Sequence, residues 1–365
     1  MISSEQLKAS GYLERTLLQY RQTSETVVMQ RNPATAHPPC VPPRVACEQS
    51  NDPFLQSRIL PDWAQDYTQL SCGNFEGGVA RASLGRVQVF REWINQAIDQ
   101  RSVADTDVVM IGVTLHQGTC SWQNREMQAD SLFIMRQGEE ARFCATTKSD
   151  ILAATIDASF LNTFSQGLYG VSADRLVNGA CLLKGDTKGI ARYKSLLLTA
   201  LSSAVARPDS LDSDPTRLQL CEDVTVAALE AMGSLSITSS SSPRDHRVHR
   251  AMVDRARSFV LSNPTANHSV EALCEHLNMS RRGLHSAFIQ VVGVNPCTYI
   301  RQVRLHGARK DILSGVPSVS EAAMRWGFWH FGMFSQYYKN QFGELPSETH
   351  RNPPCVEMGT WPPLS

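Results

Sequence analysis

Hydrophobic positions change their spacing along the chain, and the changes divide it into regions of different structure. From about Phe54 onward, short runs rich in β-branched and aromatic residues recur between turn residues, which predicts an antiparallel sandwich or barrel. The runs are SLGRVQVFREWI, DVVMIGVTLHQ, TCSWQNREM, SLFIMRQ, ARFCATT and DILAATID. A helix is expected after Asp157, where ASFLNTFSQGL follows the last long run. Residues 54–186 are therefore predicted to form one β-rich domain.

Helical spacing follows the last strand. Apolar residues recur at helical intervals over Lys188–Val205 and over Pro215–Met232, so residues 187–233 are predicted to form two amphipathic helices. These helices either cover the β domain or form part of a dimer interface, and we favour the dimer interface. The serine-rich segment at residues 234–247 then predicts a flexible linker, which is the clearest domain boundary in the chain.

The two ends of the chain contain less that can be buried. Residues 4–22 have helical spacing, but the segment after them is rich in Pro, Asn and Ser. Residues 1–53 are therefore expected to be a partly disordered extension, and residues 353–365 a disordered tail. We find neither the apolar core of a signal peptide at the N-terminus nor an apolar run of membrane-spanning length. We expect a cytoplasmic protein without membrane contact, associated with the nucleoid when bound to DNA.

Beyond the linker, residues 248–352 are predicted to be entirely helical. Caps and helix-ending Gly and Pro residues place seven helices: Arg247–Leu261, Val270–His276, Arg281–Val292, Pro296–Leu313, Ser318–Arg325, Phe331–Phe342 and a short one introduced by Pro346. Two segments repeat one plan, in which Ser-Val opens a short helix, a tight turn follows, and a longer helix ends at Gly. This plan is typical of a helix-turn-helix, whose second helix lies in the major groove and contacts base edges.

The helix predicted at Arg281–Val292 separates an apolar face from a polar one. Leu284, Phe288 and Val292 recur at helical spacing and are expected to point inward. The candidate DNA-binding residues of this first unit are Arg281, Arg282, His285 and Ser286, which lie near the helix N-terminus. Arginine donates two hydrogen bonds to guanine, and histidine donates to a base acceptor or a phosphate. The alternative is that these residues are ordinary solvated surface.

The helix predicted at Phe331–Phe342 begins with a more apolar segment. Phe334, Tyr338 and Phe342 are expected to point inward. The candidate DNA-binding residues of this second unit are His330, Phe331, Gly332, Met333, Gln336 and Lys339. The two apolar side chains suit a thymine methyl group, the glutamine suits adenine, and the two basic residues suit phosphate. Because this helix could instead pack or rest on the DNA backbone, we expect more specificity from the first unit.

The net charge is zero, but it is unevenly distributed. Residues 248–352 contain 12 Lys+Arg against 7 Asp+Glu, a balance of +5, whereas residues 1–247 contain 23 against 27, a balance of −4. This charge distribution is expected of a basic DNA-binding domain attached to a mildly acidic control domain.

Patterns for other chemistry are missing from the sequence. The 10 cysteines are scattered without a Cys-x-x-Cys pair, so we expect small apolar residues, with a redox sensor as the alternative. His116 is the single histidine between Phe54 and Gly233, too few for a cupin-type metal site. We also find no catalytic triad, phosphate-binding loop or dinucleotide fingerprint. We predict no enzyme activity, no catalytic or metal-binding residues and no cofactor.

The segment Val248–Arg351 resembles the DNA-binding domain of the AraC/XylS family of bacterial transcription regulators. The matching residues are Leu273, Ser280, Leu284, Phe288, Gly293 and Pro296 in the first unit, and Ala322, Ala323, Gly327, Phe328, Phe334, Tyr338, Lys339, Phe342, Gly343 and Pro346 in the second. The resemblance implies two units joined by a long helix, each placing a helix in the major groove, and it selects the same candidate residues. The chain departs from the family at Gly332, where the family often has a polar residue.

Many members of this family carry an N-terminal cupin-like barrel followed by helices, used for ligand sensing or dimerisation, and the predicted order of elements is similar. The expected fold class is therefore a multidomain α and β protein, with a cupin-like β barrel or sandwich, flanking helices and an all-α DNA-binding domain. Should the barrel hold a small effector, the candidate contacts are Trp93, Trp122, Phe133, Arg136 and Phe143. Aromatic core packing and dimerisation without a ligand are the alternatives.

The resemblance implies a sequence-specific regulator that binds operator or promoter DNA as a homodimer. It favours an activator, with RNA polymerase as a partner, over a repressor or a ligand-independent regulator. Two other hypotheses remain open at this point. The protein could be a non-specific architectural DNA binder, or an interaction module whose DNA-binding fold no longer binds DNA.

Overall fold

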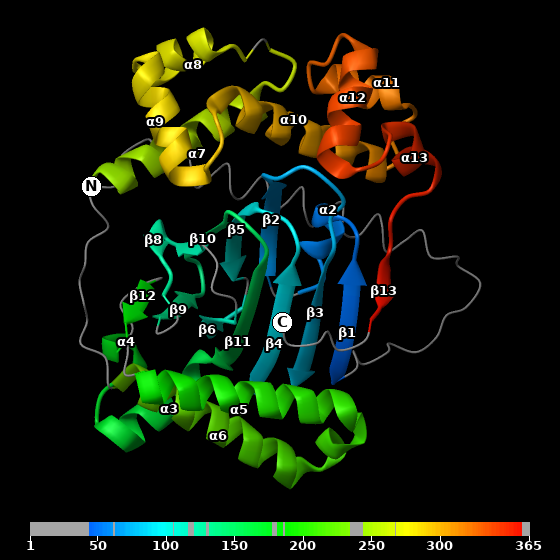
Figure 1. Cartoon of the computed structure of the whole chain (residues 1–365). Coiled ribbons are helices and arrows are strands. Elements are labelled where there is room, and N and C mark those ends of the chain that lie inside the picture. The colour runs from blue at the N-terminus through cyan, green and yellow to red at the C-terminus, as the bar shows by residue number, and fades with distance from the viewer. Residues whose placement is uncertain are drawn as a thin grey trace.

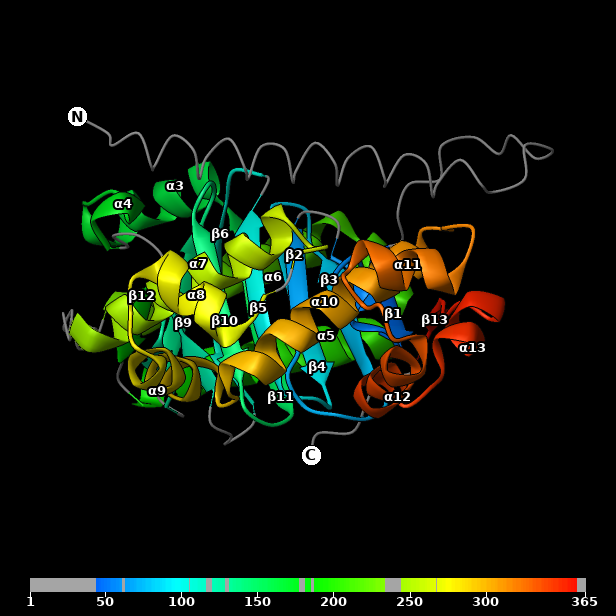
Figure 2. The same ribbon diagram turned by 90° about the horizontal axis from the view of Figure 1, so that it is seen from above.

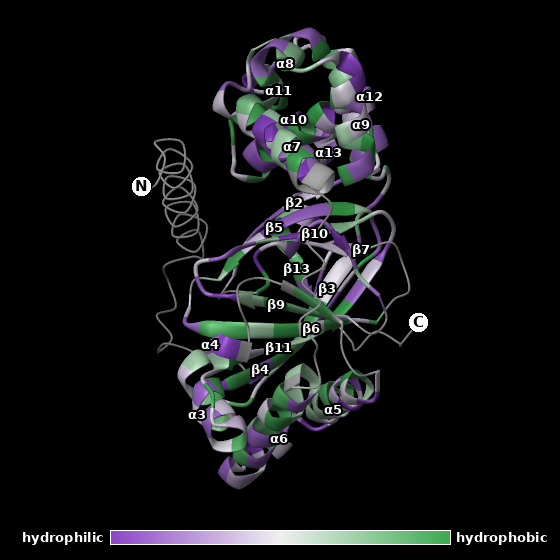
Figure 3. Cartoon of the chain, turned by 90° about the vertical axis from the view of Figure 1, so that its left-hand side faces the viewer, coloured by the Kyte–Doolittle hydropathy of each residue, from purple (hydrophilic) through white to green (hydrophobic). Residues whose placement is uncertain are grey.

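A computed structural model describes residues 44–60, 63–104, 106–115, 120–128, 131–176, 181–184, 187–233, 244–266 and 268–359. Figure 1 shows the course of the chain, and Figure 3 shows its layers from top to bottom. The C-terminal helices lie on a five-stranded sheet, which faces an eight-stranded sheet, which is covered by further helices. This architecture confirms the expected fold class, with a β-rich N-terminal domain of the sandwich type and an all-α C-terminal domain.

The described strands form two antiparallel sheets. The larger sheet has the order β12 (Cys181–Lys184), β9 (Ser131–Arg136), β6 (Val108–Thr114), β11 (Ser149–Asp157), β4 (Val87–Ile94), β3 (Gly77–Ser83), β1 (Val45–Ser50) and β13 (Val356–Met358). The smaller sheet has the order β2 (Trp63–Gln69), β5 (Ile98–Ala104), β10 (Glu140–Ala145), β7 (Cys120–Trp122) and β8 (Arg125–Glu126). The sequence runs located β4, β6, β7, β9, β10 and β11, whereas β1, β2, β3, β5 and β12 were not predicted.

Strand alternation divides the apolar residues between two cores. On β4, Phe90 and Ile94 point toward the smaller sheet, whereas Val87 and Val89 point away from it. The outward set packs against α3 (Ala158–Tyr169), α5 (Thr187–Ala206) and α6 (Asp214–Gly233). These helices confirm the ones predicted after Asp157 and at residues 187–233, and they cover one face of the larger sheet.

The C-terminal domain contains the seven predicted helices. They are α7 (Arg244–Ser262), α8 (Val270–Leu277), α9 (Arg281–Val292), α10 (Pro296–Leu313), α11 (Val319–Arg325), α12 (Phe331–Phe342) and α13 (Pro346–Arg351). Three shorter helical segments, α2 (Pro53–Gln56), α4 (Ala173–Leu176) and η1 (Pro208–Asp212), belong to the N-terminal domain. Within the described ranges, no helix combines the length and apolar character that crossing a membrane requires.

The structure shifts three of the predicted boundaries. β1 lies within the predicted extension, but it is an ordered strand, because its residues pair with Gly77–Ala82 of β3. β13 lies within the predicted disordered tail, where it pairs with β1. α7 begins at Arg244, inside the predicted linker. β1 and β13 are short and partly polar, and their edge-to-edge pairing depends on residues distant in sequence. The helix expected at residues 4–22, the serine-rich residues 234–243 and His116 lie outside the described residues.

Candidate DNA-binding surface

The first helix-turn-helix unit consists of α8 and α9 and is shaped by local caps. The Ser269 hydroxyl accepts a hydrogen bond from the Ala272 amide at 3.1 Å, and the Ser280 hydroxyl accepts one from the Gly283 amide at 3.2 Å. Asn278 turns the chain in the left-handed conformation with φ of 52°. Gly293 ends α9 in the same conformation with φ of 72°. These short-range signals explain why the sequence located both helices.

The two faces of α9 separate as predicted. Leu284, Phe288 and Val292 are buried, whereas Arg281, Arg282, His285 and Ser286 are exposed. Arg281 forms an ion pair with Glu271 of α8. Arg282 makes no ion pair with a residue of the described segments, so its guanidinium is available to a ligand.

The second unit consists of α11 and α12, joined by a turn that α10 holds in place. The Ser318 hydroxyl caps α11 by accepting a hydrogen bond from the Glu321 amide at 3.1 Å. Gly327 in the turn has φ of 70°, and a Cβ there would lie 2.6 Å from Nη2 of Arg304. Arg304 donates from Nε to the Trp326 carbonyl oxygen at 2.6 Å and from Nη2 to that of Gly327. The turn therefore needs glycine for its conformation and for its close contact with α10.

The helix α12 also separates its faces, but its exposed face is of mixed character. Phe334, Tyr338 and Phe342 are buried. All six of the predicted contact residues are exposed, namely His330, Phe331, Gly332, Met333, Gln336 and Lys339. His330 stands at the N-cap position, but its side chain accepts no capping hydrogen bond.

The two candidate recognition helices lie on the same side of α10 (Figure 2). The side view agrees, since α9 and α12 share one flank of the C-terminal domain there (Figure 3). The predicted contact residues of both units therefore belong to helices on one flank of the domain. This is the arrangement that two insertions into the major groove of one duplex require.

The N-terminal domain contacts the C-terminal domain through charged residues on the outer face of the smaller sheet. Arg101 of β5 lies directly opposite Arg142 of β10, a pair of like charges that is unfavourable by itself. Asp254 of α7 accepts hydrogen bonds from both, at 2.7 Å from Arg101 and 2.8 Å from Arg142. The helix α7 thus adds a second negative charge to that of Glu140 on β10, which lies 2.7 Å from Arg142 and 3.9 Å from Arg101.

Asp99 is the buried centre of this interface. Arg250 of α7 donates to its Oδ1 at 2.8 Å, and Tyr299 of α10 donates to its Oδ2 at 2.8 Å. Burial alone would raise the pKa of Asp99, but Arg250, Arg101 and Arg257 outweigh that effect and lower the pKa to about 2. The carboxylate therefore stays ionised and holds both helices.

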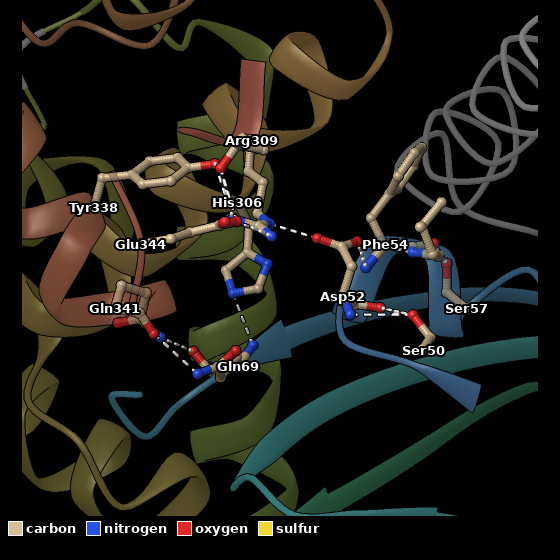
Figure 4. A network of polar contacts seen from close by, with 12 residues as sticks. Ser50, Asp52, Phe54, Ser57, Gln69, His306, Arg309, Tyr338, Gln341 and Glu344 are labelled. Carbon is tan, nitrogen blue, oxygen red and sulfur yellow. Dashed lines mark hydrogen bonds and ion pairs between the residues drawn. The ribbon is translucent and has the colours of Figure 1, made fainter. Parts of the chain in front are cut away.

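A second buried network links the N-terminal domain to α12 (Figure 4). Asp52 caps α2 by accepting hydrogen bonds from the backbone amides of Phe54 and Leu55, and it also forms an ion pair with Arg309 of α10. Arg309 donates to the Tyr338 hydroxyl at 2.9 Å and pairs with Glu344 at 2.8 Å. One guanidinium therefore connects α2, α10, α12 and the residues after α12.

The helix α12 also contacts the sandwich directly. The side-chain Nε2 of Gln341 donates to the backbone carbonyl oxygen of Gln69 at 2.9 Å. In return, the side-chain Nε2 of Gln69 donates to the backbone carbonyl oxygen of Gln341 at 3.0 Å. Gly343 has φ of 81°, and a Cβ at this position would overlap Asn74. Sequence reasoning missed this interface. Its only signal was the acidic and polar residues between apolar ones in β2 and β5.

The five candidate effector contacts do not line one cavity. Trp122, Phe133 and Phe143 are buried in the core between the sheets, where the first two rings have centroids 4.8 Å apart. Trp93 lies on the other face of β4, against the core covered by the helices. Arg136 forms an ion pair with Asp174. Two open grooves contain none of these five residues: one of about 730 Å³ between α5 and α6, and one of about 640 Å³ between α6 and the β3–β4 turn.

Titratable side chains do not gather into a metal site within the described ranges, where no group of three or more His, Cys, Asp or Glu residues has suitable geometry. The cysteines whose state is described are free thiols. Burial raises the pKa of the Cys144 thiol to about 12 and that of Cys120 to about 11. These two thiols are therefore protonated and behave as small apolar residues.

Comparisons with known proteins agree with this geometry. Residues 273–352 match a family model described as a helix-turn-helix domain. The XylDLEGF operon transcriptional activator of Pseudomonas putida is 39% identical over 101 residues, which are 27% of this chain and 32% of that protein. The virulence regulon transcriptional activator VirF of Yersinia enterocolitica is 25% identical over 239 residues, 64% of this chain and 86% of that protein.

Among solved structures, the AraC-like transcriptional activator CuxR is 15% identical with a TM-score of 0.37, over 72% of this chain and 95% of that one. The chain spans about a third of the length of the first curated relatives that it matches. Residues 273–352, which the family model matches, lie in the C-terminal domain and run from α8 through both recognition helices to the end of α13. Through this domain, the chain belongs to the AraC/XylS family of bacterial transcription regulators.

Proposed function

We propose that this protein is a sequence-specific transcription regulator that binds double-stranded DNA through α9 and α12. The observation that carries the proposal is the placement of both helices on one side of α10, with Arg282, His285, Gln336 and Lys339 exposed. Such side chains contact base edges and phosphates in the major groove. The relatives are named as activators, which favours activation, with RNA polymerase as a partner, over repression. We propose no catalytic role and a cytoplasmic location.

The N-terminal domain is proposed to control how the two units are presented to DNA. Its support is the buried interface, in which Asp99 holds α7 and α10 and Asp52 reaches α12 through Arg309. An effector can change this arrangement only if it binds two arrangements with different affinity. Binding of an effector to this domain remains a proposal, with Trp122, Phe133 and Phe143 as the candidate contacts that share one core, and a thermal-shift screen of the full chain against metabolites tests it. No shift with any metabolite would favour dimerisation as the role of this domain.

Dimerisation is proposed to use α5 and α6. The groove beside them is lined by the apolar Leu196 and Val226 and by the charged Glu222 and Arg192, and Arg192 forms an exposed ion pair with Glu230 at 3.0 Å. A twofold contact needs such self-complementary charge and apolar area. Light scattering after size-exclusion chromatography is expected to give the mass of a dimer for the natural chain. Val226→Asp is expected to give that of a monomer, and a natural chain that is monomeric both free and on DNA would contradict the proposal.

The first experiment is a selection of genomic fragments by the full-length protein at fixed physiological salt. A motif that occurs twice is expected, each copy with one half-site for α9 and one for α12, and the repeat would establish specific dimeric binding. Equal affinity for recovered and random fragments would favour the architectural DNA binder instead. Absence of any salt-sensitive DNA affinity would contradict DNA binding altogether.

A further inference from the structure

The helix α12 exposes large apolar side chains at its N-terminal end. Phe331 is 44% exposed and Met333 is 45% exposed, and Trp329 just before the helix is 63% exposed. Clustered exposed apolar side chains of this size commonly mark a contact surface. The first two positions of α9 are Arg281 and Arg282, where α12 has Phe331 and Gly332. The two helices therefore offer the groove different chemistry.

The polar side chains beside these apolar ones are neutral or positively charged. Gln336 follows Met333 by three positions and is exposed on the same side of the helix. Lys339 lies one turn further along, and α12 contains no acidic residue. An amide, a cation and an apolar surface without negative charge suit a nucleic-acid ligand, since phosphate groups would repel carboxylates.

Gly332 leaves the surface between the two apolar side chains open. A Cβ at this position would have no atom within 4 Å, so solvent occupies the space. Any longer side chain there would stand between the helix start and the floor of the groove. Its absence lets Phe331 and Met333 approach a base pair closely.

We propose that α12 recognises A·T base pairs by placing Phe331 and Met333 against thymine methyl groups, while Gln336 bonds to the adenine. The inference deepens the proposed function and rests on it. Among the base pairs, A·T alone presents a methyl group together with the adenine N6 and N7 atoms that pair with an amide. Arg282 of α9 suits guanine, so the two half-sites differ in composition.

The competing occupant of this apolar surface is another protein. DNA is favoured because Phe331 and Met333 occupy the same part of their helix as Arg281 and Gly283 do in α9. Both helices also lie on one side of α10 (Figure 2). A protein contact would not require this correspondence or the neighbouring glutamine and lysine.

The test is a pair of parallel selections with the full-length chain. One random duplex library contains thymidine, and the other contains deoxyuridine, which lacks only the 5-methyl group. With thymidine, we expect one half-site with guanine and one rich in A·T pairs. With deoxyuridine, the preference of the second half-site should weaken to the part that Gln336 supplies, with affinity about fourfold lower per methyl group removed, as for one buried methylene. The guanine half-site should stay unchanged.

Variants locate the effect. Met333→Ala should reduce the difference between thymidine and deoxyuridine on the selected site, because one of the two methyl contacts is lost. Met358→Ala, which changes a 75% exposed methionine outside the two units, should retain it. The proposal is overturned if the second half-site is equally preferred in both libraries, or if Met333→Ala retains the full difference. If neither half-site is recovered, the proposed function fails with it; if the guanine half-site alone is recovered, the proposed function stands and this inference fails.

Discussion

The two helix-turn-helix units share a backbone plan but differ in how they are held. The recognition helix α12 of the second unit bonds directly to the sandwich through Gln341, and Arg309 ties it to Asp52. The recognition helix α9 of the first unit bonds to α7 through Gln290 and His249. The core of its unit packs against three residues of the sandwich, Leu70, Ala97 and Cys144. A change in the N-terminal domain would therefore reach the second unit more directly than the first.

The largest expected effect is the loss of the charge that anchors the second unit. Arg309→Met leaves Asp52 buried without its cation, which should cost about 3–5 kcal/mol of stability. Denaturant unfolding followed by circular dichroism measures this loss. Arg325→Met is the matched control, because its ion pair is exposed and should contribute at most about 1 kcal/mol. Equal losses in the two variants would mean that Arg309 does not anchor α12.

A pH dependence should follow from His306 at the same interface. Burial lowers the pKa of His306 to about 4, although Asp52 and Asp66 act in the opposite direction. Its Nε2 accepts a hydrogen bond from the Gln69 amide at 2.9 Å and must be unprotonated. Because the unfolded chain binds this proton more readily, stability is retained above about pH 6.5 and falls as the pH drops toward about 4.

Thermal melting between pH 7.5 and pH 4.5 measures this loss. His306→Gln should flatten the profile, because its side chain cannot titrate. The exposed His285, changed to Gln in α9, should leave the profile as it is. An unchanged profile in His306→Gln would show that another group is responsible.

Base recognition by the first unit should depend on Arg282. Arg282→Ala is expected to cost about 1–3 kcal/mol on the selected site and to relax the preference at one base pair, as measured by fluorescence anisotropy. The opposite change, Gly332→Arg, fits the open space at the equivalent position of α12 and should add a preference for guanine. Equal losses on selected and random DNA for Arg282→Ala would exclude base reading by this residue.

Helix capping offers a smaller test of the comparison. Ser280→Ala should destabilise α9 by about 1 kcal/mol, since the Gly283 amide loses its acceptor. His330→Ser should stabilise α12 by a similar amount, because His330 provides no side-chain cap. Amide hydrogen exchange at each helix start measures both changes. Unaltered exchange in both variants would show that tertiary packing, not capping, sets the stability of these helix ends.

The smallest effect is expected at Lys339. Lys339→Ala should weaken binding to all sequences alike and lower the salt slope by about one, because one phosphate contact is lost. Arg207→Ala, at an exposed residue just before η1 in the N-terminal domain, is the control and should leave the slope unchanged. A loss confined to one sequence would instead give Lys339 a base contact.

Much of the C-terminal domain could be predicted because its signals are local. Ser269 and Ser280 accept hydrogen bonds from amides three residues away, and Gly293 and Gly343 end their helices in the left-handed conformation. The exposed faces of α9 and α12 follow from the same helical spacing. The buried Arg309 network could not be predicted, because an arginine in a helix usually faces solvent.

The sequence by itself determined the tandem helix-turn-helix units, since caps and helical periodicity act within a few residues. Only the tertiary structure decided the role of β2 and β5. Their polar residues conceal them from a search for alternating strands, and Asp66, Asp99 and Arg101 lie on the outer face because a second domain covers it. The tertiary structure also placed Trp93 and Trp122 in different cores. Strand alternation predicts that successive residues of a strand point to opposite faces of the sheet, but not which of the two faces packs against the other sheet.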